Sequence, residues 1–273
     1  INEINKKGLR IEGPSGTLII RDIIASDKIM DAKGSDLIVI STKAYQVEEV
    51  AKKTAALLSN NSTVLTIQNG LGSAEKVSNY ISKKHILVGV ADGFGASVVK
   101  PGHIHHNAMK LIRIGSLVTT EMEKANRMAH IWKSAGFNVK AFTDIERLVW
   151  EKFICNVTFS APCTVFKCRI GKLMESPELW EIALGCMREA FEIGKRRKIS
   201  FAFEDPETYV SEFGSNMPMA KPSMLLDHEK GQRSEIDVIN GMVVKLGIRL
   251  GIKTPYNQTL STIILYSEAK HRL

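Results

Sequence analysis

Residues 36–72, DLIVISTKAYQVEEVAKKTAALLSNNSTVLTIQNGLG, contain two apolar runs of strand length on either side of a helical pattern. The runs cover residues 36–41 and 62–67, and between them, over residues 45–58, apolar side chains recur at helical spacing. Strands that are apolar throughout are typical of a parallel sheet whose two faces are both covered. The stretch therefore predicts a strand–helix–strand unit with parallel strands.

Beyond this stretch a further strand pattern follows, after which the chain changes to turn-separated strands, one helix and a final strand that ends at residue 142. Pro101-Gly102 is a strong turn signal, and it precedes two candidate antiparallel strands. The expected elements are strands at residues 86–90, 104–106, 110–114 and 137–142 and a helix at residues 122–135. Together they predict a parallel α/β domain over residues 1–142.

From residue 143 onward the patterns are helical. Thr143-Asp-Ile-Glu146 matches a capping box, in which the Thr and Glu side chains bond to free N–H groups at a helix start. No convincing strand follows, so residues 143–273 are expected to form an all-helical domain. The predicted fold class is therefore an α/β domain followed by a helical domain.

The formal net charge of +8 is scattered along the chain. Basic residues form a run only at Lys195-Arg196-Arg197-Lys198, where a helical pattern ends and cations complement the helix dipole. Nucleic-acid-binding proteins usually concentrate such charge in a stripe with interleaved aromatic residues. A solvated helix end explains the run better, and no nucleic-acid partner is expected.

The sequence also argues against export, membrane insertion and metal binding. No stretch approaches the roughly 18 apolar residues of a membrane span, and residues 1–10 lack the apolar core of a signal peptide. The cysteines form no CxxC pair and have no His at metal-ligand spacing. We therefore expect a cytoplasmic protein with reduced, buried thiols and no metal; the cysteines are Cys155, Cys163, Cys168 and Cys186.

Polar residues follow each of the two apolar strands of the opening stretch. Lys43 comes just after the first strand, and Asn69 lies in the loop Gln68-Asn69-Gly70-Leu71-Gly72 after the second. The carboxyl ends of parallel strands are where ligands bind in open α/β sheets. The two side chains could face one crevice, or they could be a solvent lysine and an ordinary Asn-Gly turn.

The helix that follows the capping box carries Lys152, Asn156 and Ser160 four residues apart, so they share one helical face. Val149, Trp150, Phe153 and Ile154 surround Lys152 in sequence. Partial desolvation of its ammonium would lower the pKa and suit it to proton donation. The alternative is a lysine that extends to solvent from a half-buried helix.

Two later segments carry further polar residues. Ser223 and Asp227 lie four residues apart after Pro222, and Glu235 and Asp237 lie where another helical pattern begins. Acidic side chains in a first helical turn usually complement the dipole. By physical reasoning alone, Glu235 and Asp237 take that role.

Taken in order, these segments resemble the ketopantoate reductase family. The matching features span nearly the whole chain: STKAYQ around Lys43, the Gln68–Gly72 loop, the Pro101-Gly102 turn, Trp150-x-Lys152-x3-Asn156, Ser223-Met-Leu-x-Asp227, Glu235-Ile-Asp-x-Ile-Asn240-Gly241 and residues 247–255. The resemblance implies a Rossmann-like domain and a helical domain like that of 6-phosphogluconate dehydrogenase. It further implies NADPH-dependent reduction of ketopantoate to (R)-pantoate, in pantothenate and coenzyme A biosynthesis.

The resemblance also assigns roles to single residues. Lys152 becomes the general acid and Glu235 a second catalytic residue that also contacts the cofactor. The other cofactor contacts are Lys43, Asn69 and Ala96. The keto acid would contact Asn69, Lys152, Asn156, Ser160 and Ser223. Pairing of two copies through the helical domain is a further expectation from the family.

The sequence departs from the family pattern in two places. The glycine-rich GxGxxG loop, expected between the first strand and first helix, is missing, so the Rossmann-like domain is expected to lack its first βα unit. Ser160 stands where the family commonly has another Asn, and a hydroxyl has a shorter reach.

Two alternative functions remain open. A reductase of the same fold could act on another small 2-keto or 3-hydroxy acid, since fold alone does not fix the substrate. A non-catalytic relative could bind a nucleotide or a partner. Retention of Lys152, Asn156, Ser223 and Glu235 at suitable spacing argues against the second alternative.

Overall fold

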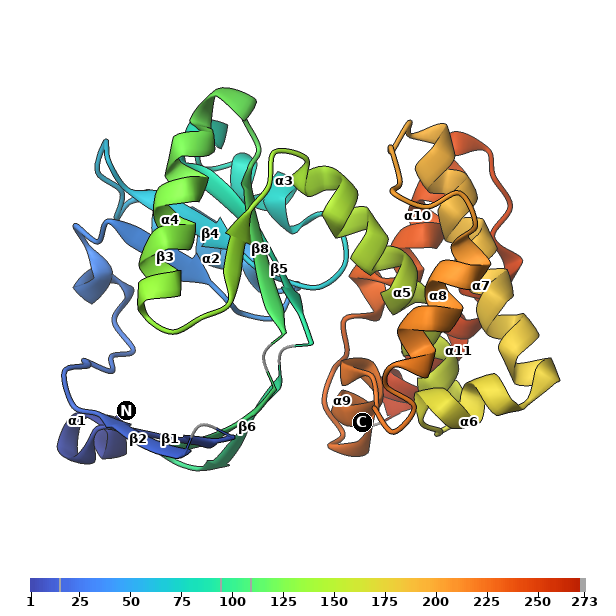
Figure 1. Ribbon diagram of the computed structural model, residues 1–273, viewed down its shortest axis with the longest axis horizontal. Helices are drawn as coiled ribbons and strands as arrows, with labels where there is room; N and C mark the ends of the chain where they lie inside the picture. The colour runs from blue at the N-terminus through green and yellow to red at the C-terminus, as the bar shows by residue number, and fades with distance from the viewer. Residues whose placement is uncertain (15, 94, 109, 271–273) are drawn as a thin grey trace. The chain divides into compact units, whose positions relative to one another are not determined.

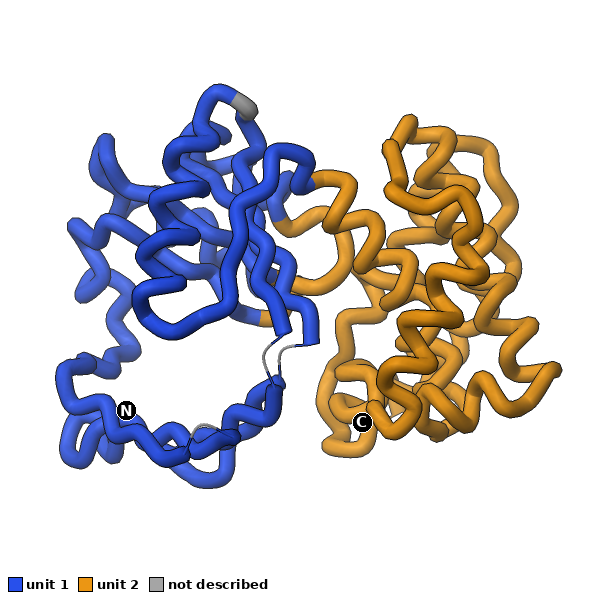
Figure 2. Tube along the Cα trace, in the orientation of Figure 1, with its two compact units in different colours: residues 1–42, 46–67, 74–145 blue, residues 43–45, 68–73, 146–273 orange. Residues whose placement is uncertain are grey.

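The computed structural model describes residues 1–14, 16–93, 95–108 and 110–270, and it divides into two compact units (Figure 2). Unit 1 comprises Ile1–Thr42, Gln46–Ile67 and Ala74–Ile145, and unit 2 comprises Lys43–Tyr45, Gln68–Ser73 and Glu146–Leu273. The main boundary between the two units thus lies after Ile145. Two short loops from the first half of the chain group with the helices.

Unit 1 is built around a five-stranded sheet in the order β3-β4-β5-β8-β9. The strands are β3 (Leu37–Ile40), β4 (Thr63–Thr66), β5 (Ile86–Asp92), β8 (Leu111–Ser116) and β9 (Val139–Ala141). β3, β4 and β5 run parallel, with Leu37 opposite Thr63 and Val64 opposite Ile86. The predicted parallel strand–helix–strand unit is confirmed, because helix α2 (Val47–Ala55) connects β3 to β4.

Both faces of this sheet are covered (Figure 1). Val64 packs on one face with Val47 of α2 and Val77 of α3 (Ser73–Ser78). Leu65, the next residue, packs on the other face with Met128 of α4 (Met122–Ser134). Since side chains alternate along a strand, covering both faces requires the continuous apolar runs seen in the sequence.

A second sheet of four strands has the order β2-β1-β7-β6. Its strands are β1 (Leu9–Gly13), β2 (Gly16–Ile20), β6 (Gly95–Lys100) and β7 (His103–Ala108). The prediction of neighbouring antiparallel strands at 104–106 and 110–114 needs correction, since β7 and β8 lie in different sheets. β7 pairs with β6 across the Pro101-Gly102 turn, while β8 pairs with β5, because its apolar side chains are buried in the main sheet.

Short helical elements complete unit 1: α1 (Asn2–Lys7), η1 (Ile29–Ala32), η2 (Lys83–His85) and η3 (Thr119–Glu121).

Unit 2 is helical throughout the part that the structure describes, as the sequence predicts. Its helices are α5 (Ile145–Val165), α6 (Ile170–Glu175), α7 (Pro177–Arg196), α8 (Pro206–Ser215), α9 (Ser223–Glu229), η4 (Ile236–Val238), α10 (Asn240–Leu250) and α11 (Pro255–Lys270). α5 begins at Ile145, one residue later than a capping box on Thr143 would place it. Lys195 and Arg196 close the last turn of α7, which confirms the solvated helix end.

The core of unit 2 surrounds α5. Trp150, Phe153 and Ile154 are buried there with Met187 of α7 and Val243 of α10. Three of the four cysteines are buried in the same unit, Cys168 is partly buried, and none of the four is in a disulfide.

The buried carboxylate of Glu189 holds the start of α11. Its Oε1 accepts a hydrogen bond from the Tyr256 N–H (2.8 Å), and its Oε2 accepts bonds from the Asn257 N–H (3.0 Å) and Nδ2 (2.7 Å). The first N–H groups of a helix have no partner within the helix. Glu189 of α7 therefore acts in place of a local capping side chain.

Replacing Glu189 by glutamine is expected to lower the free energy of unfolding by about 1–3 kcal/mol at neutral pH. The NH₂ group of the glutamine would face the N–H donors of α11 and could not accept their hydrogen bonds. Burial raises the pKa of the Glu189 carboxyl, outweighing the bonds from Asn257 and Tyr256 that lower it. A carboxyl whose pKa is raised by folding contributes most stability below its unfolded pKa, and this contribution is lost as pH rises through the folded pKa.

Denaturant unfolding of wild type and Glu189→Gln across a range of pH measures this effect. The difference in stability between the two proteins should narrow as pH rises. A difference that does not depend on pH would show that the carboxyl titrates alike in the folded and unfolded chains.

Candidate functional site

Two loops at the carboxyl ends of parallel strands belong to the helical unit by their contacts. Lys43–Tyr45 comes shortly after β3, and Gln68–Ser73 comes shortly after β4. The Ala44 N–H donates to Glu235 Oε1 (3.0 Å), and the Leu71 N–H donates to the Val238 carbonyl (3.0 Å). Residues 235–238 therefore bond to both loops.

Close approach of backbone at the second loop requires glycine. Gly70 has a φ of +78°, and a Cβ at this position would lie 2.3 Å from the Val238 carbonyl oxygen. A side chain would therefore both strain the backbone and separate the loop from η4. Asn69, which precedes this glycine, is half-buried.

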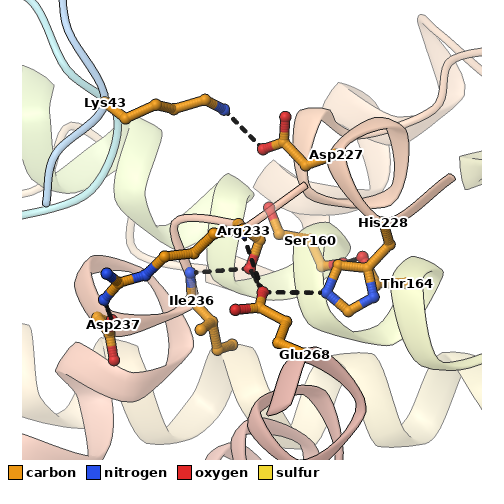
Figure 3. A network of polar contacts seen from close by, with 10 residues as sticks. Lys43, Ser160, Thr164, Asp227, His228, Arg233, Ile236, Asp237 and Glu268 are labelled. Atoms are coloured by element: carbon orange, nitrogen blue, oxygen red, sulfur yellow. Dashed lines mark hydrogen bonds and ion pairs between the residues drawn. The ribbon is translucent and has the colours of Figure 1, made fainter. Parts of the chain in front are cut away.

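Lys43 forms an ion pair with Asp227. Its Nζ lies 2.6 Å from Asp227 Oδ2, and the Asp227 side chain is only 12% exposed (Figure 3). Asp227 lies one helical turn after Ser223, the exposed first residue of α9. Lys43 is therefore a structured residue and not a solvent lysine.

Lys152 and Asn156 are partly exposed polar residues in an otherwise buried stretch of α5. They are the only residues described between Trp150 and Thr164 that are not buried. Asn156 Nδ2 is inaccessible to solvent and has no hydrogen-bond partner. Because a buried donor without an acceptor is costly, this amide is suited to an acceptor that a ligand supplies.

Ser160 lies on the same face of α5 but is enclosed, with only 4% of its surface exposed. Its carbonyl accepts a bond from Thr164 Oγ1 (2.7 Å). Lys152 and Asn156 are therefore both partly exposed to solvent, whereas Ser160 is buried.

Physical reasoning alone assigned Glu235 as a complement to a helix dipole, but its carboxylate bonds to a loop instead. It precedes the short η4, and it is 7% exposed. One of its carboxylate oxygens, Oε1, accepts the Ala44 N–H. Asp237 lies in the first turn of η4, where the prediction placed an acidic residue, and it also pairs with Arg233 (2.8 Å) at the surface. The Arg233 guanidinium lies 4.5 Å from the centre of the Tyr45 ring.

The predicted site residues fall into both units. Lys43, Asn69, Lys152, Asn156, Ser160, Ser223 and Glu235 all belong to unit 2. Ala96 belongs to unit 1, where it is exposed on β6 opposite His106.

Sequence reasoning missed three residues around this site, namely His228, Ser234 and Glu268. Glu268 Oε1 accepts bonds from the Ser234 N–H (2.9 Å) and Oγ (2.6 Å) and lies 3.1 Å from His228 Nε2. Glu268 is separated from these partners by 34 and 40 positions. No local spacing pattern signals such a contact.

Within the described residues, no group of His, Cys, Asp and Glu side chains is arranged to hold a metal ion. None of the helices in that part of the chain combines the length and the apolar character needed to cross a membrane.

Two family models match the chain in succession. The model for "Ketopantoate reductase PanE/ApbA" matches residues 1–119, and that for "Ketopantoate reductase PanE/ApbA C terminal" matches residues 144–266. A 2-dehydropantoate 2-reductase of Archaeoglobus fulgidus is 29% identical over 262 residues, which are 96% of this chain and 85% of the relative. The enzyme of the same name from Aquifex aeolicus is 29% identical over 240 residues, 85% of this chain and 76% of the relative.

Solved structures share the fold. A PanE/ApbA family ketopantoate reductase from Ralstonia eutropha superposes with a TM-score of 0.91 at 23% identity, covering 100% of this chain and 89% of that one. A ternary structure of D-mandelate dehydrogenase with NADH and anilino(oxo)acetate has a TM-score of 0.90 at 21% identity, covering 100% of this chain and 88% of that one.

Proposed function

This chain belongs to the ketopantoate reductase family, and from this premise we propose that it reduces the C2 ketone of 2-dehydropantoate to (R)-pantoate with NADPH, in pantothenate biosynthesis. The relatives that match most of its length carry the name 2-dehydropantoate 2-reductase. The observation that supports the proposal most directly lies on α5, where the partly exposed Lys152 is one turn from Asn156, whose amide nitrogen has no hydrogen-bond partner.

The substrate offers groups that suit these side chains. A 2-keto acid carries a carboxylate and a carbonyl oxygen, both acceptors, and Asn156 Nδ2 is a donor without a partner. Ser223 at the exposed start of α9 and Asn69 would provide further hydrogen bonds. Ser160 would contact the substrate from a buried position.

Lys152 is the general acid in this proposal. A nicotinamide cofactor, when bound, supplies the hydride that adds to C2 of the keto acid. Lys152 Nζ donates a proton to the C2 oxygen as negative charge develops there, which gives the hydroxyl group of the product. A charged donor aimed at this oxygen acts mainly in the transition state.

Each carboxylate oxygen of Glu235 would accept one hydrogen bond. Oε1 accepts the Ala44 N–H, which fixes the loop that carries Lys43. Oε2 is then directed to a hydroxyl group of the substrate or of the cofactor ribose. This arrangement would let one carboxylate align both ligands.

The cofactor would be held by Lys43, Asn69, Ala96 and Glu235. The fit rests on the two loops after β3 and β4, the position at which open α/β sheets bind ligands. The structures of D-mandelate dehydrogenase contain NADH. Comparison of kcat/KM with NADPH and with NADH tests the proposed preference for NADPH.

Replacing Asn156 by alanine is expected to raise the KM for the keto acid by about ten- to a hundredfold, since one hydrogen bond to a charged group is worth about 1.5–3 kcal/mol. The free energy of unfolding should not fall, because the amide nitrogen has no bond to lose and its removal eliminates a buried donor without an acceptor. Steady-state kinetics and denaturant unfolding check the two parts. A clear loss of stability with an unchanged KM would mean that Asn156 is structural.

The proposed function is tested by following oxidation of NADPH and NADH with a panel of 2-keto acids. The panel contains 2-dehydropantoate, 2-ketoisovalerate and phenylglyoxylate, the keto acid that corresponds to mandelate. We expect the highest kcat/KM for 2-dehydropantoate with NADPH. Preference for another keto acid would identify a reductase of different specificity, and no turnover by the folded protein would support a non-catalytic relative.

A further inference from the structure

Glu268 of α11 is a buried carboxylate that the proposed chemistry does not use. It is 6% exposed, and a single oxygen, Oε1, accepts bonds from both the N–H (2.9 Å) and the Oγ (2.6 Å) of Ser234. The same oxygen lies 3.1 Å from His228 Nε2 (Figure 3). Burying a carboxylate is costly unless hydrogen bonds compensate, so these contacts fix the three side chains relative to one another.

The partners of Glu268 are the chain neighbours of two residues in the candidate site. Ser234 immediately precedes Glu235, whose Oε1 accepts the Ala44 N–H (3.0 Å). His228 immediately follows Asp227, whose Oδ2 lies 2.6 Å from Lys43 Nζ. One oxygen of α11 therefore contacts the backbone N–H beside the first of these residues and the side chain beside the second.

Ser234 also bonds to the backbone on the far side of Glu235. Its Oγ donates to Glu268 and also accepts a bond from the Ile236 N–H (3.3 Å). The backbone is thus bonded on both sides of Glu235, at residues 234 and 236. A side chain between two fixed peptide groups keeps its direction with little loss of conformational entropy on ligand binding.

We infer that Glu268 is a positioning residue for Glu235, acting through Ser234, and for the Asp227–Lys43 pair, acting through His228. The inference rests on the proposed function for its effect on the reaction. Its structural part, that Glu268 maintains the bond between Glu235 and the Ala44 amide, can be tested without turnover.

Three variants of the full chain separate this role from general stability. Glu268→Leu removes the acceptor, Ser234→Ala removes the hydroxyl and keeps the backbone bond, and Glu268→Gln keeps an oxygen where Oε1 lies. Glu189→Gln is the matched control, because Glu189 is another buried carboxylate of unit 2 that accepts backbone N–H bonds and is not bonded to residues 228–235.

Two readouts are measured for every protein: hydrogen–deuterium exchange of the Ala44 amide, and KM and kcat with 2-dehydropantoate. Glu268→Leu and Ser234→Ala should each speed Ala44 exchange about tenfold and raise the keto-acid KM about tenfold, with a smaller change in kcat. Glu268→Gln should recover most of both effects. Glu189→Gln should lower the Tm without changing either readout.

Unchanged Ala44 exchange in Glu268→Leu and Ser234→Ala would overturn the inference. An equal change in Glu189→Gln would also overturn it, because the effect would then reflect general loosening of the unit. If the wild-type protein reduces no keto acid, the proposed function fails, and the exchange readout alone decides whether Glu268 positions Glu235.

Discussion

Replacing Lys152 by alanine is expected to lower kcat about 10²- to 10⁴-fold, the usual contribution of a positioned general acid. Lys152 is the only cationic residue between Trp150 and Thr164 of α5, so no other residue of this described stretch can take over proton donation. Affinity for NADPH should stay unchanged, since the proton is required at the keto oxygen. Single-turnover kinetics and cofactor titration measure the two quantities.

The matched control for Lys152 is Lys172→Ala. Lys172 lies on the surface of the same unit, where its Nζ is 2.6 Å from Glu175 Oε2. Its removal should leave turnover within about twofold, because exposed ion pairs contribute little. Near-normal turnover of Lys152→Ala would exclude this lysine as the acid.

Replacing Glu235 by alanine is expected to raise the KM for the keto acid or the cofactor by tenfold or more. The change removes the carboxylate that is proposed to bind a ligand hydroxyl group, and a hydrogen bond to a charged group is worth about 1.5–3 kcal/mol. It also leaves the Ala44 N–H without its acceptor, which lowers stability. Each 1.4 kcal/mol of binding free energy is a factor of about ten in affinity. The effect on kcat should be smaller than that of Lys152→Ala, because Glu235 aligns ligands and does not donate the proton.

Asp237→Ala is the control for Glu235. Asp237 lies two residues away and pairs with Arg233 at the surface, at 37% side-chain exposure. The Asp237→Ala protein should have the same Michaelis constants for both ligands as the wild type. If Glu235→Ala leaves both Michaelis constants unchanged, its assigned role is wrong.

The sequence predicts the elements of this fold where one local pattern controls them. β3, α2 and β4 follow from apolar runs on either side of a helical repeat, and the helical half follows from uninterrupted periodicity. Strand pairing is less predictable, because β7 and β8 are consecutive and still join different sheets. Which sheet a strand joins depends on partners distant in the chain.

The site shows the same division. The spacing of Lys152 and Asn156 on one helix is local, and the structure keeps both partly exposed. The Lys43–Asp227 pair spans 184 positions, and the Ala44–Glu235 bond spans 191. Glu235 could be assigned a site role only from family resemblance, since its neighbours in sequence suggest a dipole complement.

The grouping of the Lys43–Tyr45 and Gln68–Ser73 loops with the helices limits how this chain can be recombined. A chimaera of two relatives joined at residue 145 would take these loops from one parent and the carboxylate that receives the Ala44 amide from the other. Transplanting a substrate preference would therefore require three segments to move together. In natural exchange of the two halves, active hybrids would be confined to parents in which Ala44 and Glu235 still meet.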